Sequence, residues 1–96
     1  MHLARSVVRV ATYVIETYLS RARSSELDAA TARLREAVGA TSSDEWPVHH
    51  VRSFFVPEDE TCFHVVEAPS LEATIELSRL AALTPDRIVE AEPATG

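Results

Sequence analysis

Lysine is absent from this 96-residue sequence, so all nine of its basic residues are arginines. Fifteen acidic residues outnumber them, and the formal net charge is -6. The arginines are scattered along the chain, whereas a nucleic-acid-binding protein usually gathers its basic residues in a stripe or patch. The composition therefore argues against nucleic acid as a partner.

Cysteine, glycine and long apolar runs are also scarce. The single cysteine, Cys62, can form neither an internal disulfide nor a thiolate metal cage by itself. With only two glycines, Gly39 and Gly96, the chain has no glycine-rich loop to hold a phosphate. No apolar run approaches the roughly 18 residues that span a bilayer, and residues 1–10 lack the pattern of a signal peptide. We expect a cytoplasmic protein that does not enter a membrane.

The composition that remains is typical of a globular protein, with 46% hydrophobic and 25% charged residues. A chain of this length accommodates one domain with a small core. We place that domain at residues 11–92, between an N-terminal extension at 1–10 and a polar C-terminal tail at 93–96.

Strands and helices alternate along the chain. Segments rich in β-branched and aromatic residues predict four strands, at 11–19, 48–56, 61–67 and 87–91. Apolar residues three and four positions apart predict two helices, at 25–39 and 70–82. Gly39 is expected to end the first helix as a left-handed cap, and Ser70 to cap the start of the second. Trp46 is expected to fold back over an edge of the core. The second helix offers five apolar side chains for burial: Leu71, Ile75, Leu77, Leu80 and Ala81.

This order is the βαββαβ pattern of an α+β, ferredoxin-like fold with a four-stranded antiparallel sheet. Right-handed crossovers place both helices on one face of the sheet. The first strand carries apolar residues on both of its alternating sides, so the face opposite the helices also needs cover. We therefore expect a homodimer in which a second copy of the chain covers this open sheet face.

The turn at residues 57–60 predicts the register of a hairpin, pairing Phe55 with Cys62, Phe54 with Phe63, Ser53 with His64 and Val51 with Val66. This register directs His49, Ser53, Cys62 and His64 to one side, which we take to be the open face, and Glu16 is expected to join them there. Imidazole, thiolate and carboxylate groups together suit a divalent metal such as zinc or nickel. Glu16, Ser53 and His64 are thus candidate ligand-binding residues, and His49, Cys62 and His64 are candidate metal ligands.

Other interpretations of the same residues stay open. Cys62 packs as a small hydrophobe in the simplest of them, and His64 hydrogen-bonds Ser53 or Glu16. In an enzyme, His64 would be a general base oriented by Glu16, as in a cofactor-free dimeric cyclase, isomerase or monooxygenase. A structural or regulatory partner of another protein is the third interpretation. No residue is assigned as catalytic.

Several segments together resemble one family. They are YVIE at 13–16, VRS at 51–53, VPEDETCF at 56–63, EAPS at 67–70 and DRIVE at 86–90. On these residues the chain resembles the small, mostly bacterial family catalogued as domain of unknown function 4242. The resemblance implies a ferredoxin-like fold that is often dimeric, and one member of the family binds nickel. The chain departs from the family at His64, where a second cysteine is common, and at Ala82, where a glycine ends the second helix.

The leading hypothesis from the sequence is therefore a cytoplasmic homodimer that binds a small ligand or a divalent, nickel-like metal on its open sheet face. The resemblance does not assign nickel ligands to positions of this chain, so the metal remains an alternative to the small ligand.

Overall fold

Four strands form one antiparallel sheet with the order β2-β3-β1-β4. The structure is a computed structural model that describes residues 8–94. Its regular elements are β1 (Ala11–Tyr18), the 3-10 turn η1 (Arg21–Arg23), α1 (Glu26–Thr41), β2 (His49–Val56), the 3-10 turn η2 (Pro57–Asp59), β3 (Thr61–Ala68), α2 (Leu71–Leu80) and β4 (Arg87–Ala91). This βαββαβ order confirms the predicted ferredoxin-like α+β fold.

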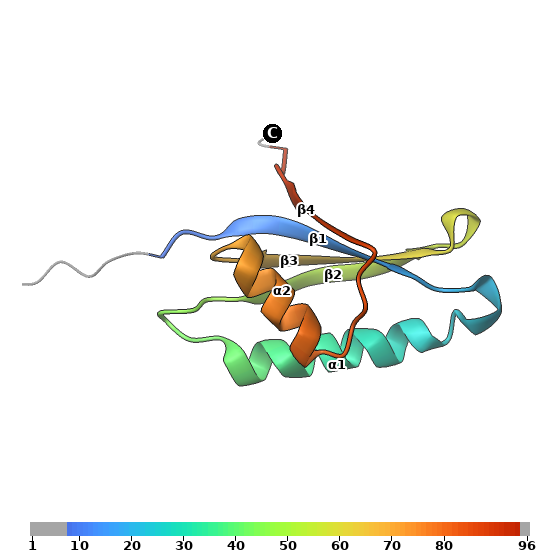
Figure 1. Ribbon diagram of the computed structural model, residues 1–96, viewed down its shortest axis with the longest axis horizontal. Helices are drawn as coiled ribbons and strands as arrows, with labels where there is room; N and C mark the ends of the chain where they lie inside the picture. Colours follow the sequence, from blue (N-terminus) through green and yellow to red (C-terminus); the bar gives the residue numbers. More distant parts are fainter. Residues whose placement is uncertain (1–7, 95–96) are drawn as a thin grey trace, which may run out of the picture.

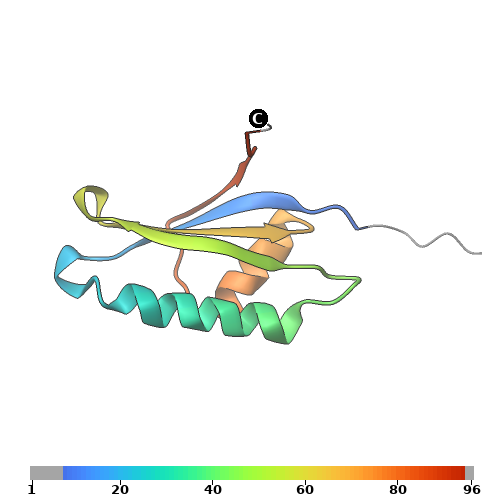
Figure 2. The same cartoon turned by 180° about the vertical axis from the view of Figure 1, so that it is seen from behind.

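Both helices lie on the same side of the sheet, below it in each of two opposite views (Figures 1 and 2). The sheet therefore has one face covered by α1 and α2 and one open face. Residues 1–7 of the expected N-terminal extension, and the last two residues of the expected tail, fall outside the described part of the chain. Within residues 8–94, neither helix combines the length and the apolar composition that a membrane-spanning helix needs.

The core fills the space between the helices and the covered face. Alternate residues of β1 and β3 point into it, among them Ile15 and Val66, which are fully buried. Leu34 of α1 and Leu77 of α2 meet them from the helix side. Burying a side chain of this size contributes about 1.5–3 kcal/mol, so these contacts are the main source of stability.

The N-terminus of α2 is capped as the sequence predicted, because the Ser70 hydroxyl accepts a hydrogen bond from the backbone N–H of Ala73. The prediction for Gly39 was wrong. It lies inside α1 with an ordinary negative φ, and the helix continues to Thr41. A left-handed cap does occur, but at Ala82, where φ is 56°.

Ala82 belongs to a Schellman motif that closes α2. The N–H of Leu83 donates to the carbonyl of Ser78, and the N–H of Ala82 donates to the carbonyl of Arg79. Ala82 is therefore a non-glycine residue held in the left-handed region, which glycine adopts more readily. An alanine has a steric cost there that glycine avoids.

Three large apolar residues of α2 are more exposed than expected: Leu71, Ile75 and Leu80. The buried stripe of this helix combines Leu77 with three smaller residues, Ala73, Thr74 and Ser78. Small side chains let the helix approach the sheet closely, and this packing decides which stripe is buried. Trp46 is also exposed, so the prediction that it covers an edge of the core was wrong.

Candidate functional site

The sheet divides the five candidate residues between its two faces. Cys62 and His64 of β3 face the helices and are buried, and Ser53, the cross-strand partner of His64, shares that face. Glu16 directly follows the β1 partner of His64, and consecutive strand residues point to opposite faces. Glu16 therefore lies on the open face. His49 lies on the open face as well. The expectation that all five residues share the open face was wrong.

A β-bulge accounts for the position of His49. The register shifts between His50 and Arg52, so His50 pairs with Val66 in place of the predicted Val51. A shift of one residue turns side chains to the other face, which brings His50 under the helices and His49 out of the group. The other three predicted pairs of the hairpin are confirmed.

A chain of hydrogen bonds links four side chains on the covered face. Ser53 Oγ lies 2.6 Å from Nδ1 of His64 and 2.8 Å from Nε2 of His50. At the outer end of the chain, Arg35 Nε donates a long hydrogen bond of 3.5 Å to His50 Nδ1. The simplest sequence interpretation, in which His64 hydrogen-bonds Ser53, is confirmed.

Arg35 determines which group donates and which accepts in each of these hydrogen bonds, because a guanidinium can only donate. His50 accepts at Nδ1 and so carries its proton on Nε2, which donates to Ser53. The Ser53 hydroxyl then donates to His64 Nδ1, and the proton of neutral His64 lies on Nε2. That buried Nε2 has no hydrogen-bond partner among the described residues.

Both histidines are held in their neutral forms. The pKa of His64 falls to about 4, mainly because burial disfavours the charged ring, with His50 and Arg33 adding repulsion. Burial also lowers the pKa of His50, assisted by Arg35. Near neutral pH, His64 is therefore a neutral hydrogen-bonded group within the fold.

The possible metal ligands of the chain do not lie around a common point in the part that the structure describes. Among residues 8–94, no group of three or more His, Cys, Asp or Glu side chains converges. His49 lies on the face opposite Cys62 and His64, so the predicted metal-ligand set does not assemble within one chain. The residues present do not fit a nickel or zinc ion. The proposed general base His64 is likewise separated by the sheet from Glu16, its proposed orienting partner.

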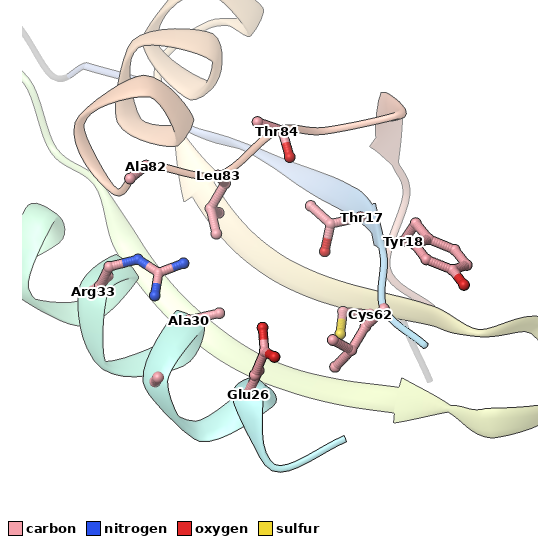
Figure 3. A pocket seen from close by; sticks show the side chains of 11 residues that line it. Thr17, Tyr18, Glu26, Ala30, Arg33, Cys62, Ala82, Leu83 and Thr84 are labelled. Atoms are coloured by element: carbon pink, nitrogen blue, oxygen red, sulfur yellow. The ribbon is translucent and has the colours of Figure 1, made fainter. Parts of the chain in front are cut away.

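A pocket of about 210 Å³ opens between α1, the covered face of the sheet and the loop after α2 (Figure 3). The sheet contributes Thr17 and Cys62, and α1 contributes Glu26 and Arg33. The Thr17 hydroxyl and the Cys62 thiol face the Arg33 guanidinium across it, with the Glu26 carboxylate between them, whereas the Tyr18 ring points away (Figure 3). This pocket is the strongest candidate for a ligand site.

Arg33 is anchored at the pocket wall by the end of α2. Its Nε donates a 2.9 Å hydrogen bond to the carbonyl of Ala81, one of the carbonyls that a helix C-terminus leaves without a partner. A cation is also favourable near the negative end of the helix dipole. The left-handed turn at Ala82 thus positions the loop that closes the pocket, and the guanidinium spans the gap between the two helices.

The Cys62 thiol at the opposite wall is neutral and almost fully buried. Burial raises the pKa of Cys62, and a hydrogen bond with Thr17 offsets part of this effect. A buried thiol with a raised pKa is a poor nucleophile. The position of Cys62 therefore suits packing and weak hydrogen bonding better than covalent chemistry.

Arg33, Thr17 and His50 were not predicted from the sequence as site residues. Arg33 occupies a polar position of an amphipathic helix, where an arginine is typically exposed. Thr17 is an ordinary strand residue. Nothing in their local sequence indicates that α1, β1 and the loop after α2 meet at one pocket.

Comparisons with known proteins support the fold. No protein-family model and no curated protein matches this chain. The crystal structure of SCO4226 from Streptomyces coelicolor A3(2) is similar, with a TM-score of 0.72 and 20% sequence identity, over 88% of this chain and 100% of that one. At this identity the similarity shows the fold alone: the chain has the ferredoxin-like architecture of SCO4226.

Proposed function

We propose that this chain is a homodimeric, cytoplasmic member of the domain of unknown function 4242 family that binds a small ligand without catalysing its conversion. The ligand site in this proposal is the pocket between α1 and the sheet, and the open face is the contact between the two copies. The observation that carries it is that the Arg33 guanidinium, the Thr17 hydroxyl and the Cys62 thiol converge on a pocket that no side chain of the described residues fills.

The dimer is supported by the chemistry of the open face. Its middle carries Val14, Phe63 and Val65, and the Phe54 ring stacks on Phe63 with a centroid distance of 5.2 Å. Phe54 is 43% exposed in the single chain. The neighbouring ion pair between Arg87 and Glu16 supplies both signs of charge, so this part of the surface is complementary to its own copy across a two-fold axis.

We propose binding of a small ligand in preference to binding of a metal or to catalysis, because the residues that either alternative needs lie apart. The candidate metal ligands are split between the two faces of the sheet, and so are His64 and Glu16. A cytoplasmic location is supported by the single free thiol, which is typical of a reducing compartment.

A two-part experiment tests the proposal. Sedimentation velocity at micromolar concentration is expected to show a dimer, and a strict monomer would contradict that part. A screen of small metabolites by ¹H–¹⁵N correlation spectroscopy is expected to give saturable shifts at the amides of Thr17, Ala30 and Leu83. Elemental analysis of the untagged protein covers the alternative, because stoichiometric nickel or zinc without such shifts would favour a metal protein.

A further inference from the structure

We propose that the pocket beside α1 is an oxyanion site, and that its ligand is a small monocarboxylate held by the terminal nitrogens of Arg33. This inference rests on the proposed ligand-binding function and specifies the chemistry of that same site. Among residues 8–94, Arg33 and Glu26 are the only charged residues that line the pocket.

The negative charge of Glu26 is already compensated. Its two carboxylate oxygens accept hydrogen bonds from Nε and Nη2 of Arg23, which lies three residues earlier and does not line the pocket. A carboxylate held in this two-point arrangement has its charge balanced by the guanidinium that binds it. Glu26 therefore does not neutralise Arg33, and within the described part of the chain Arg33 forms no ion pair.

Arg33 keeps the donors that recognise a carboxylate. Its Nε is used by the carbonyl of Ala81, which fixes the plane of the guanidinium. The N–H groups of the two terminal nitrogens remain, and they form an end-on fork that matches the two oxygens of a carboxylate. Because the hydrogen bond to Ala81 holds the fork in place, a ligand need not order this long side chain on binding.

The other walls of the pocket limit the size and polarity of the group attached to the carboxylate. Thr17 and neutral Cys62 offer weakly polar groups opposite Arg33, and Ala30 and Leu83 provide an apolar surface. The volume of about 210 Å³ is below the roughly 300–1,000 Å³ of pockets for drug-sized ligands. These features favour a ligand whose carboxylate carries a short carbon chain with at most one further polar group, such as a small aliphatic acid or 2-hydroxy acid.

The test uses the full chain at constant ionic strength and pH 7, with sodium propionate as the probe and propionamide as its neutral analogue. Propionate is expected to shift the Nε–H signal of Arg33 and the amides of Thr17 and Leu83 in a saturable way, with a dissociation constant in the millimolar range. Propionamide is expected to bind at least about tenfold more weakly, because it lacks the charge that the arginine fork recognises.

Two variants and a control complete the test. Arg33→Gln is expected to weaken propionate binding at least about tenfold. Thr17→Val retains Arg33 and its hydrogen bond to the carbonyl of Ala81, and it is expected to weaken propionate binding a few fold. Arg79→Gln makes the same charge change on α2, where Arg79 pairs with Glu76 outside the pocket, and should leave binding unchanged. Spectra of each variant show whether it is folded.

Three results would overturn the inference: equal binding of propionate and propionamide, unchanged propionate binding in folded Arg33→Gln, or no binding of propionate up to about 100 mM. If neutral metabolites still shift the pocket amides in any of these cases, the pocket is a ligand site of different chemistry and the proposed function survives. If no metabolite shifts them, both proposals are wrong.

Discussion

Ser53 Oγ lies 2.6 Å from Nδ1 of His64, and this contact joins β2 to β3 beneath the two helices. Ser53→Ala would leave the buried His64 ring without its Nδ1 partner. The expected cost is about 1–3 kcal/mol in the free energy of unfolding, the penalty for an unsatisfied buried polar group. Urea denaturation measures it. Ser25→Ala is the control, because Ser25 is exposed and its side chain makes no capping hydrogen bond. Equal stability of the two variants would contradict the prediction.

The lowered pKa of His64 makes stability depend on pH. The ring protonates near its usual pKa of 6.5 in the unfolded chain but only near 4 in the fold. Its contribution is fully present above pH 6.5 and is lost as the pH falls toward 4, because the unfolded state binds the proton first. The loss is at most roughly 3 kcal/mol.

The pH prediction is checked by measuring unfolding free energies between pH 7 and pH 4 for the native protein and for His64→Leu. The carboxylates and His50 titrate in both proteins, so the difference between the two curves isolates His64. The variant is expected to show a flatter dependence, whatever its absolute stability. Parallel curves would mean that His64 titrates normally in the fold.

Ala82→Gly is expected to stabilise the protein by about 0.5–1 kcal/mol. Glycine relieves the cost of a φ of 56° at the Schellman turn, and this gain exceeds the entropy it adds to the unfolded chain. The control, Ala32→Gly in the exposed interior of α1, is expected to destabilise by about 1 kcal/mol. Thermal unfolding of both variants measures the contrast, and a loss of stability in Ala82→Gly would rule out strain at this turn.

Phe54→Glu is expected to weaken dimerisation by about a hundredfold or more, since it places a charge in the centre of the proposed contact. Ile75→Glu serves as the matched control because Ile75 is 51% exposed and lies on α2, away from the open face. Both substitutions change surface residues and should alter folding little. Sedimentation equilibrium measures the association. If the two variants associate equally, the open face is not the dimer contact.

Much of the fold was predictable because it depends on local patterns. Segments rich in β-branched and aromatic residues identified the strands, and the turn at 57–60 set three of the four predicted pairs in the hairpin. The Ser70 cap depends on one hydroxyl beside a helix start. Each of these features involves neighbours in sequence or a short hairpin, so the residues that determine it can be seen together.

The candidate site was only partly predictable. Ser53, Cys62 and His64 do share a face, but that face is the one the helices cover. A single extra residue at the bulge after His50 reversed the positions of His49 and His50, and neither residue shows this in its local sequence. The choice between two sheet faces depends on which one receives the helices, which alternation within a strand does not report.

Local sequence patterns were enough to determine the order of the elements, the absence of a basic stripe and the presence of apolar residues on both sides of β1. Tertiary packing decided that Arg33, Thr17 and Cys62 meet at one pocket, because α1, β1, β3 and the loop after α2 come together there only when the helices pack on the sheet. It also decided which α2 stripe is buried. Contacts between distant segments depend on how whole elements pack, and no local pattern encodes that geometry.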